Sequence, residues 1–338
     1  MTCCPWFRYL FPSSQSKEFI VPSPAVQPKL HTPTTTSESF PDRDIDWSQY
    51  NALIPYKDLY WVDPDEISII RNIPSEYMSA CVANCQGELV LIHSLDKKKV
   101  KDDFESARKM LIAETLSMSK LTHPNIVKFV GFNITSESGL QCISEYIDGR
   151  TLRQVLDDPR QSKKLTWPEQ KIDIAIGIIS ALAYMHSLKP AIIHRNIQAS
   201  SIRLTSNLEP KLSGFGVSRA RTYEDDMTAG VGDFRWAAPE LLLEAMYDEK
   251  IDVYSFGVLL VELDTCAWPF AEEFGKMSKA ELQNELITGV TRPKLSAECP
   301  KVIVKIVKRC LQQDANLRPR SIELLKLLND AKLELKQE

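Results

Sequence analysis

Apolar and polar residues alternate in several short runs after residue 60, which is the pattern of half-buried strands. We predict five strands, near residues 66–70, 78–83, 88–93, 126–130 and 140–146. Between the third and the fourth strand, residues 97–121 place apolar side chains at helical spacing. Three strands, one helix and two strands predict a small antiparallel sheet that carries one helix.

The pattern becomes helical after residue 148. Thr166 and Glu169 have the spacing of a capping box, which predicts the start of a long apolar helix that reaches His186. Residues 252–261 are apolar nearly all round, as expected of a helix buried inside a lobe. A β-rich half followed by a helical half predicts an α+β fold with two lobes.

Composition narrows the class of protein. The 338 residues are 43% hydrophobic and 25% charged, which is ordinary for a soluble globular protein. A net charge of −4 argues against a nucleic-acid partner, because such proteins usually carry a basic face. The chain has no apolar run near the roughly 20 residues that a membrane helix needs, no start that resembles a secretory signal, and no cysteine pattern of a disulfide framework. We therefore expect an intracellular, cytoplasmic protein.

Residues 1–48 differ from the rest of the chain. Seven of the 20 prolines lie there, among many serines and threonines. Such a segment buries too little apolar area to offset its ordering entropy, so we predict a disordered extension. Cys3 and Cys4 stand beside aromatic residues, and S-acylation of these two cysteines would tether the protein to a membrane. The alternative is an unmodified tail.

An ordered set of short motifs runs through the remaining chain. The set comprises Glu114, His123-Pro124-Asn125, Ser144-Glu145-Tyr146, His194-Arg195, Gly214-Phe215-Gly216, Arg235-Trp236-Ala237-Ala238-Pro239-Glu240, Asp252-Val253-Tyr254-Ser255-Phe256-Gly257 and Arg318-Pro319. In this order the motifs resemble those of a protein kinase, and their wording is most similar to the tyrosine-kinase-like branch of the serine/threonine kinases. The resemblance implies a two-lobed kinase-like domain over residues 49–338. Its N-lobe, about 49–147, would hold a five-stranded antiparallel sheet and one regulatory helix, and its C-lobe, about 148–338, would be mainly helical.

The positions that carry chemistry in this family hold other residues here. The resemblance places the phosphate-pairing lysine at His93, the catalytic aspartate at Asn196, its companion lysine at Gln198, and the two metal ligands at Ser201 and Gly214. A histidine is shorter than a lysine and mostly uncharged at neutral pH. An amide cannot accept a proton as a carboxylate does, and Mg²⁺ prefers anionic oxygens.

The nucleotide pocket that the resemblance implies is altered as well. The first glycine of the chain is Gly87, which lies after the position of the family's glycine-rich loop. The resemblance places five residues around the adenine, namely Val82, Leu91, Ser144, Tyr146 and Arg203. Leu91 adds bulk, and Arg203 puts a charge on the pocket floor. We therefore expect no cofactor, because neither ATP nor Mg²⁺ would bind well.

The structural positions of the family are retained. The resemblance places Met118, Phe129, His194, Phe215 and Asp252 in the regulatory spine that couples the lobes. It pairs Glu240 with Arg318 in a buried ion pair, and His93 with Glu114. Because removal of one partner would leave a buried charge, the presence of both partners favours a folded scaffold.

These observations predict a catalytically inactive kinase-like domain, a pseudokinase, and not an enzyme. It would act as a protein-binding scaffold or allosteric regulator in intracellular signalling, with a protein partner such as an active kinase. The first alternative is an unusual but active ATP-dependent serine/threonine protein kinase. The second alternative is a nucleotide-binding switch without phosphate transfer.

Overall fold

The computed structural model describes residues 45–74, 78–96, 98, 104–215, 219–220 and 234–337. Residues 1–44, with Cys3 and Cys4, lie outside the described residues, so the predicted disorder and acylation stay predictions. Residues 75–77, where the glycine-rich loop of the family would lie, also fall outside them.

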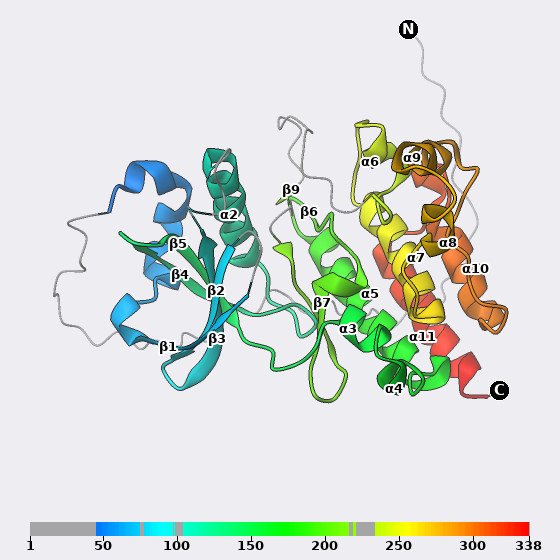
Figure 1. Cartoon of the computed structure of the whole chain (residues 1–338), viewed down its shortest axis with the longest axis horizontal. Coiled ribbons are helices and arrows are strands. Elements are labelled where there is room, and N and C mark those ends of the chain that lie inside the picture. Colours follow the sequence, from blue (N-terminus) through cyan, green and yellow to red (C-terminus); the bar gives the residue numbers. More distant parts are fainter. Residues whose placement is uncertain are drawn as a thin grey trace, which may run out of the picture. The chain divides into compact units, whose positions relative to one another are not determined.

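The N-lobe sheet has five antiparallel strands in the order β1-β2-β3-β5-β4, as predicted (Figure 1). Its strands are β1 (Ile67–Ile73), β2 (Met78–Cys85), β3 (Glu88–Leu95), β4 (Phe129–Thr135) and β5 (Gly139–Glu145). Gln86 and Gly87 connect β2 to β3 with φ angles of 52° and 90°, the left-handed pair that a two-residue hairpin turn requires. The fourth strand begins at Phe129, later than residue 126, because Val127 bonds to Leu212 of the C-lobe instead of to a sheet neighbour.

One helix of the N-lobe, α2 (Phe104–Met118), packs against the sheet. Its buried side includes Leu111, Glu114 and Met118, at the helical spacing that the sequence predicts. The described helix is shorter than the predicted range 97–121, since residues 119 and 120 form a turn.

Three short helical segments precede the sheet, and the sequence pattern does not predict them. They are η1 (Trp47–Tyr56), α1 (Lys57–Tyr60) and η2 (Pro64–Glu66). Trp61, just after α1, meets the Phe132 ring of β4 edge-on at 6.1 Å between ring centres. The Tyr60 hydroxyl donates to the Ser119 carbonyl at 2.9 Å. The segment from Trp47 to Trp61 therefore packs against β4 and is hydrogen-bonded to the turn that follows α2.

The C-lobe is mainly helical, as predicted (Figure 1). Its helices are α3 (Leu152–Leu156), α4 (Pro159–Ser162), η3 (Trp167–Lys171), α5 (Ile172–Ser187), α6 (Pro239–Leu242), α7 (Lys250–Thr265), α8 (Ala271–Phe274), α9 (Lys279–Thr288), α10 (Lys301–Cys310), η6 (Ala315–Leu317) and α11 (Ser321–Leu335). Every residue of α7 from Ile251 to Asp264 is buried, which confirms the prediction of a central helix.

The capping box predicted at Thr166 is absent from the described helix start. The Thr166 side chain accepts no capping bond, and its backbone N–H donates to the Gln170 side chain at 3.2 Å. The Lys171 N–H bonds to the Thr166 carbonyl, five residues back, so the first turn is a π-helical turn. Because this wider turn displaces Glu169 from its capping position, Thr166 and Glu169 cannot form the reciprocal hydrogen bonds of a capping box.

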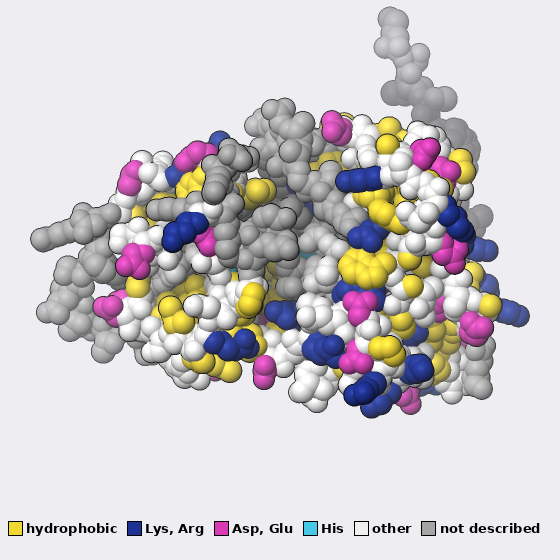
Figure 2. Space-filling view, viewed as in Figure 1, with side chains coloured by type: hydrophobic (Ala, Val, Ile, Leu, Met, Phe, Trp, Pro, Cys, Tyr) yellow, Lys and Arg dark blue, Asp and Glu magenta, His cyan; other side chains and the backbone are white. Residues whose placement is uncertain are grey.

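Short strands hold the loops that face the N-lobe. They are β6 (Ile192–Ile193), paired with β9 (Arg219–Ala220), and β7 (Ile202–Leu204), paired with β8 (Pro210–Leu212). The turn η4 (Ala199–Ser201) leads into β7. Positive and negative side chains are interspersed over the face drawn in Figure 2. None of the described helices combines the length and the apolar character that a membrane span requires.

Candidate functional site

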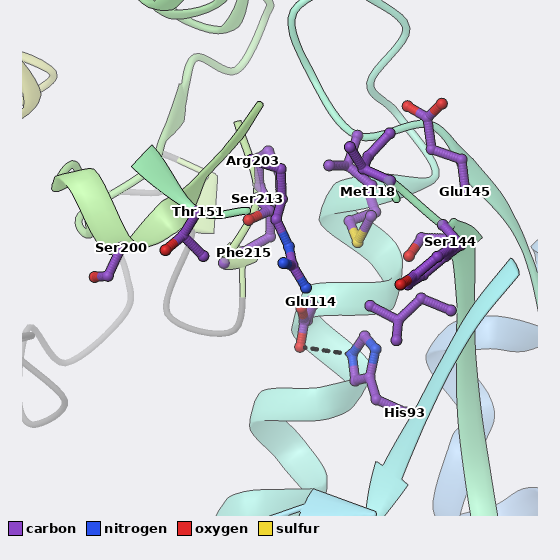
Figure 3. A pocket seen from close by; sticks show the side chains of 15 residues that line it. His93, Glu114, Met118, Ser144, Glu145, Thr151, Ser200, Arg203, Ser213 and Phe215 are labelled. Carbon is purple, nitrogen blue, oxygen red and sulfur yellow. Dashed lines mark ion pairs between the residues drawn. The ribbon is translucent and has the colours of Figure 1, made fainter. Parts of the chain in front are cut away.

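A cavity of about 290 Å³ lies between the sheet of the N-lobe and the loops of the C-lobe (Figure 3). Its lining comprises Leu91, His93, Glu114, Met118, Val127, Ser144, Glu145, Tyr146, Ile147, Thr151, Ser200, Arg203, Ser213, Gly214 and Phe215. Most predicted pocket residues therefore meet at this cavity. Val82 is the exception, because it is buried in β2 without lining the cavity.

His93 and Glu114 form the ion pair at the back of the cavity. His93 Nε2 lies 3.4 Å from Glu114 Oε2, and both side chains are largely buried (Figure 3). Burial alone would lower the pKa of His93, but the Glu114 carboxylate and the neighbouring Cys142 raise that pKa well above 6.5. The Glu114 carboxylate therefore favours the protonated form of His93 in the folded protein. The expectation of a mostly uncharged histidine did not include the carboxylate that α2 supplies, which shifts the pKa of His93 upward.

His194 begins the loop that the resemblance makes the catalytic loop, residues 194–201, and its ring is neutral and structural. Burial lowers the pKa of His194 to about 4. Its Nε2 lies 3.0 Å from the Ser213 carbonyl, so the proton sits on Nε2 and is donated there. The other ring nitrogen accepts the Asn196 N–H at 3.3 Å. The His194 ring also meets the Phe215 ring edge-on at 4.8 Å, which joins the catalytic loop to the loop after β8.

The carboxylate of Asp252 in α7 holds the same loop through hydrogen bonds. It accepts the backbone N–H groups of His194 at 2.7 Å and Arg195 at 2.8 Å. It also accepts from His186 Nε2 at 2.9 Å. The other predicted spine members, Met118 and Phe129, are buried in the core at the edge of α2 and β4.

The second predicted ion pair is formed in the C-lobe. Arg318 donates to both carboxylate oxygens of Glu240, at 2.5 and 2.8 Å. The Arg318 side chain is fully buried and also donates to the carbonyls of Lys250, Gln312 and Gln313. This bidentate pair lies outside the cavity and stabilises the C-lobe.

The structure brings four of the five altered catalytic positions together, and three of them, Asn196, Gln198 and Ser201, are hydrogen-bonded to one another. Gln198 donates to Asn196 Oδ1 at 2.5 Å, and the Ser201 hydroxyl donates to the carbonyls of Asn196 and Gln198 at 2.7 and 2.8 Å. Gly214 lies beside them, where an added Cβ would be 3.3 Å from the Asn196 amide nitrogen. In the described part of the chain no group of three His, Cys, Asp or Glu side chains could hold a metal. The residues at these positions therefore do not fit Mg²⁺, which needs anionic oxygens.

Arg203 of β7 extends from the C-lobe side into the cavity (Figure 3). Its Nη1 donates to the Gly149 carbonyl at 3.2 Å. At the outer side, Arg71 of β1 donates to the Tyr146 hydroxyl at 2.6 Å and lies over its ring. Lys211 pairs with Glu145 at 2.8 Å. The contacts of Arg71 with Tyr146 and of Lys211 with Glu145 join distant elements, so no local sequence pattern predicts them.

The two lobes, the segment that joins them and the buried histidine–phenylalanine contact define a protein-kinase fold. Comparison with known families agrees, because the model for protein tyrosine and serine/threonine kinases matches residues 79–328. The chain thus belongs to the protein kinase family.

Individual relatives show the same membership. Serine/threonine-protein kinase 12 of Arabidopsis thaliana is 30% identical over 275 residues, which cover 80% of this chain and 57% of that protein. Serine/threonine/tyrosine-protein kinase HT1 of the same plant is 30% identical over 224 residues, which cover 66% of this chain and 53% of that protein. A putative serine/threonine-protein kinase/receptor, R831, of Acanthamoeba polyphaga mimivirus is 32% identical over 79% of this chain and 16% of that protein. The chain thus spans only part of the length of these relatives.

The expectation that this chain is not an enzyme is overturned by these relatives. They are about 30% identical to this chain over the aligned residues and are named as protein kinases, which points to an enzyme. Motif differences alone had suggested inactivity, and similarity over most of the chain outweighs them.

Proposed function

We propose that this chain is an ATP-dependent serine/threonine protein kinase that uses the His93–Glu114 ion pair where the family has a lysine–glutamate pair. The observation that carries the proposal is the 3.4 Å contact between His93 of β3 and Glu114 of α2, both of which line the cavity. The kinase relatives named above support the reaction class.

Phosphate transfer is mainly a matter of positioning and charge neutralisation, so a protein can catalyse it without much covalent chemistry of its own. In the proposed reaction the bond between the γ-phosphorus of ATP and the bridging oxygen breaks. A bond forms from that phosphorus to a serine or threonine oxygen of the substrate, ADP leaves, and the hydroxyl proton passes to solvent. Asn196 orients the loop but accepts no proton. Because a general base contributes about 10²–10⁴-fold, we expect turnover to be slower than in a kinase with an aspartate there.

Transfer of radiolabelled γ-phosphate from ATP to casein tests the proposal. His93→Ala and Glu114→Gln should each lower the rate by about tenfold or more, since each breaks the buried ion pair. Glu105→Gln is the matched control on the same helix, because the Glu105 side chain is 66% exposed and should leave the rate unchanged. Absence of transfer by the unaltered chain would overturn the proposal.

The pH profile gives a second readout of the same pair. The pKa of His93 is raised in the folded protein, so its charge is present below about 6.5 and is lost as the pH rises through the folded value. The rate of phosphate transfer should therefore fall as the pH rises through the pKa of His93 in the folded protein. His93→Lys should move the fall toward the usual range of lysine, near pH 10. An identical profile in the two proteins would mean that residue 93 does not supply the charge.

A further inference from the structure

The residues at the metal positions do not fit Mg²⁺, whereas the charges around the cavity favour an anion. This difference bears on whether the nucleotide binds with or without the metal. Resting on the proposed kinase function, we infer that the cavity takes the nucleotide as a metal-free anion, held directly by Arg203 and His93. The phosphates would then meet protein cations where other members of the family use Mg²⁺.

The oxygen atoms at the metal positions are already engaged. Gly214 has no side chain, and beside it, at the position of the catalytic aspartate, the Asn196 side-chain oxygen accepts from Gln198 at 2.5 Å. The Ser201 hydroxyl is directed at two backbone carbonyls. Mg²⁺ dehydrates reluctantly and binds through carboxylates, so neutral groups that are bonded to each other offer it little.

The charges around the cavity favour an anion. Of its two carboxylates, Glu114 is matched by His93 at 3.4 Å and Glu145 by Lys211 at 2.8 Å. Arg203 adds a positive charge, and its hydrogen bond to a described residue goes to a neutral carbonyl, that of Gly149. A guanidinium has five N–H donors in a planar fork, the geometry that binds phosphate oxygens.

The positions of the two cations support a phosphate chain as ligand. Arg203 enters from β7 of the C-lobe, whereas His93 lies on β3 of the N-lobe (Figure 3). An anion between them would contact both lobes. Mg²⁺ on the phosphates would cancel part of their charge and weaken this contact, so the metal should lower affinity.

Isothermal titration calorimetry on the full chain tests the inference. ATP should bind in the presence of a chelator, and added Mg²⁺ should weaken that binding several-fold. Adenosine should bind at least tenfold more weakly than ATP, because it lacks the phosphates. Tripolyphosphate, the bare anion, should also bind more weakly than ATP, and equal affinity would overturn the assignment to a nucleotide.

Variants of Arg203 separate binding from a structural role. Arg203→Leu should weaken metal-free ATP binding by about 10–100-fold, the value of a charged hydrogen bond lost. Arg203→Lys keeps the charge and should recover part of the affinity. Arg160→Leu, an exposed arginine on α4, is the control and should bind ATP as the unaltered chain does. Unchanged affinity in Arg203→Leu would overturn the inference.

The outcomes also distinguish this inference from the proposed function. ATP binding that requires Mg²⁺ would overturn the inference and leave the kinase proposal intact. Metal-free binding without any phosphate transfer would support the inference and overturn the kinase proposal. Absence of ATP binding under both conditions would overturn both.

Discussion

Replacement of Asp252 by asparagine should destabilise the protein by about 3 kcal/mol, within a range of roughly 2–5 kcal/mol. Asp252 is completely buried in α7, and its carboxylate is the acceptor that holds the catalytic loop. One oxygen accepts from the backbone of Arg195, and the other accepts from the backbone of His194 and from the His186 ring.

The magnitude follows from these three bonds. Asparagine has nearly the shape of aspartate but offers one carbonyl oxygen and one NH₂ group. In either orientation the NH₂ group faces a backbone N–H, so that buried donor loses its acceptor at a cost of about 1–3 kcal/mol. The bonds that remain lose the charge of the acceptor, which accounts for about 1 kcal/mol each.

Urea unfolding followed by tryptophan fluorescence measures the effect. The control is Asp173→Asn, which removes an ion pair with Lys332 from a carboxylate that is 56% exposed and should change the unfolding free energy by less than about 1 kcal/mol. If Asp252→Asn unfolded at the same urea concentration as Asp173→Asn, the loop would not depend on this carboxylate and the reasoning would be refuted.

The pH dependence supplies an internal check. Burial alone would raise the pKa of Asp252, but the hydrogen bond and charge of His186, together with His194, lower it below 3.8. A lowered folded-state pKa means that the contribution is present above 3.8 and is lost as the pH falls through the folded value. The difference in stability between the unaltered chain and Asp252→Asn should therefore be constant near neutral pH and shrink in acid.

Two further substitutions test the packing of the C-lobe by the same urea assay. Glu240→Gln should cost roughly 3–5 kcal/mol, because it leaves the buried Arg318 guanidinium without its carboxylate partner. Gly257→Ala should cost about 1–3 kcal/mol although alanine favours helices, since its Cβ would lie 2.6 Å from the Cys310 Cβ. Gly275→Ala is the control for both, with its nearest atom at 3.7 Å. A variant as stable as this control would contradict the corresponding prediction.

The sheet and the central helix could be predicted because the burial of their residues follows the local spacing of apolar residues in the sequence. Buried and less buried residues alternate along β3, and the apolar surface of α7 is buried all round. The helices at Trp47–Tyr60 escaped prediction for the opposite reason. Their residues pack on Phe132 and Ser119, more than 50 positions away, and no local pattern records such contacts.

The site shows the same limit. The altered residue types could be assigned from motif register, and the structure does bring Asn196, Gln198, Ser201 and Gly214 together. The charge of His93 could not be assigned in that way, because it depends on a 3.4 Å approach to a carboxylate on another element. Thus identity followed from the sequence, whereas ionisation required the fold.

The backbone at Gly214 lies in the left-handed region, which glycine adopts without strain. Its φ angle is +82°, in the region where a side chain costs about 1–2 kcal/mol of strain. An added Cβ would also lie 3.3 Å from the Asn196 amide nitrogen, so the end of that flexible side chain would shift slightly, and 3.4 Å from the Ser201 Cβ, which is an ordinary contact distance. Aspartate is among the few residues with a side chain that adopt this conformation, so position 214 favours glycine without excluding an aspartate. With glycine at this position, the positive charge for the phosphates in the proposed metal-free binding would come from His93 and Arg203, which both line the cavity.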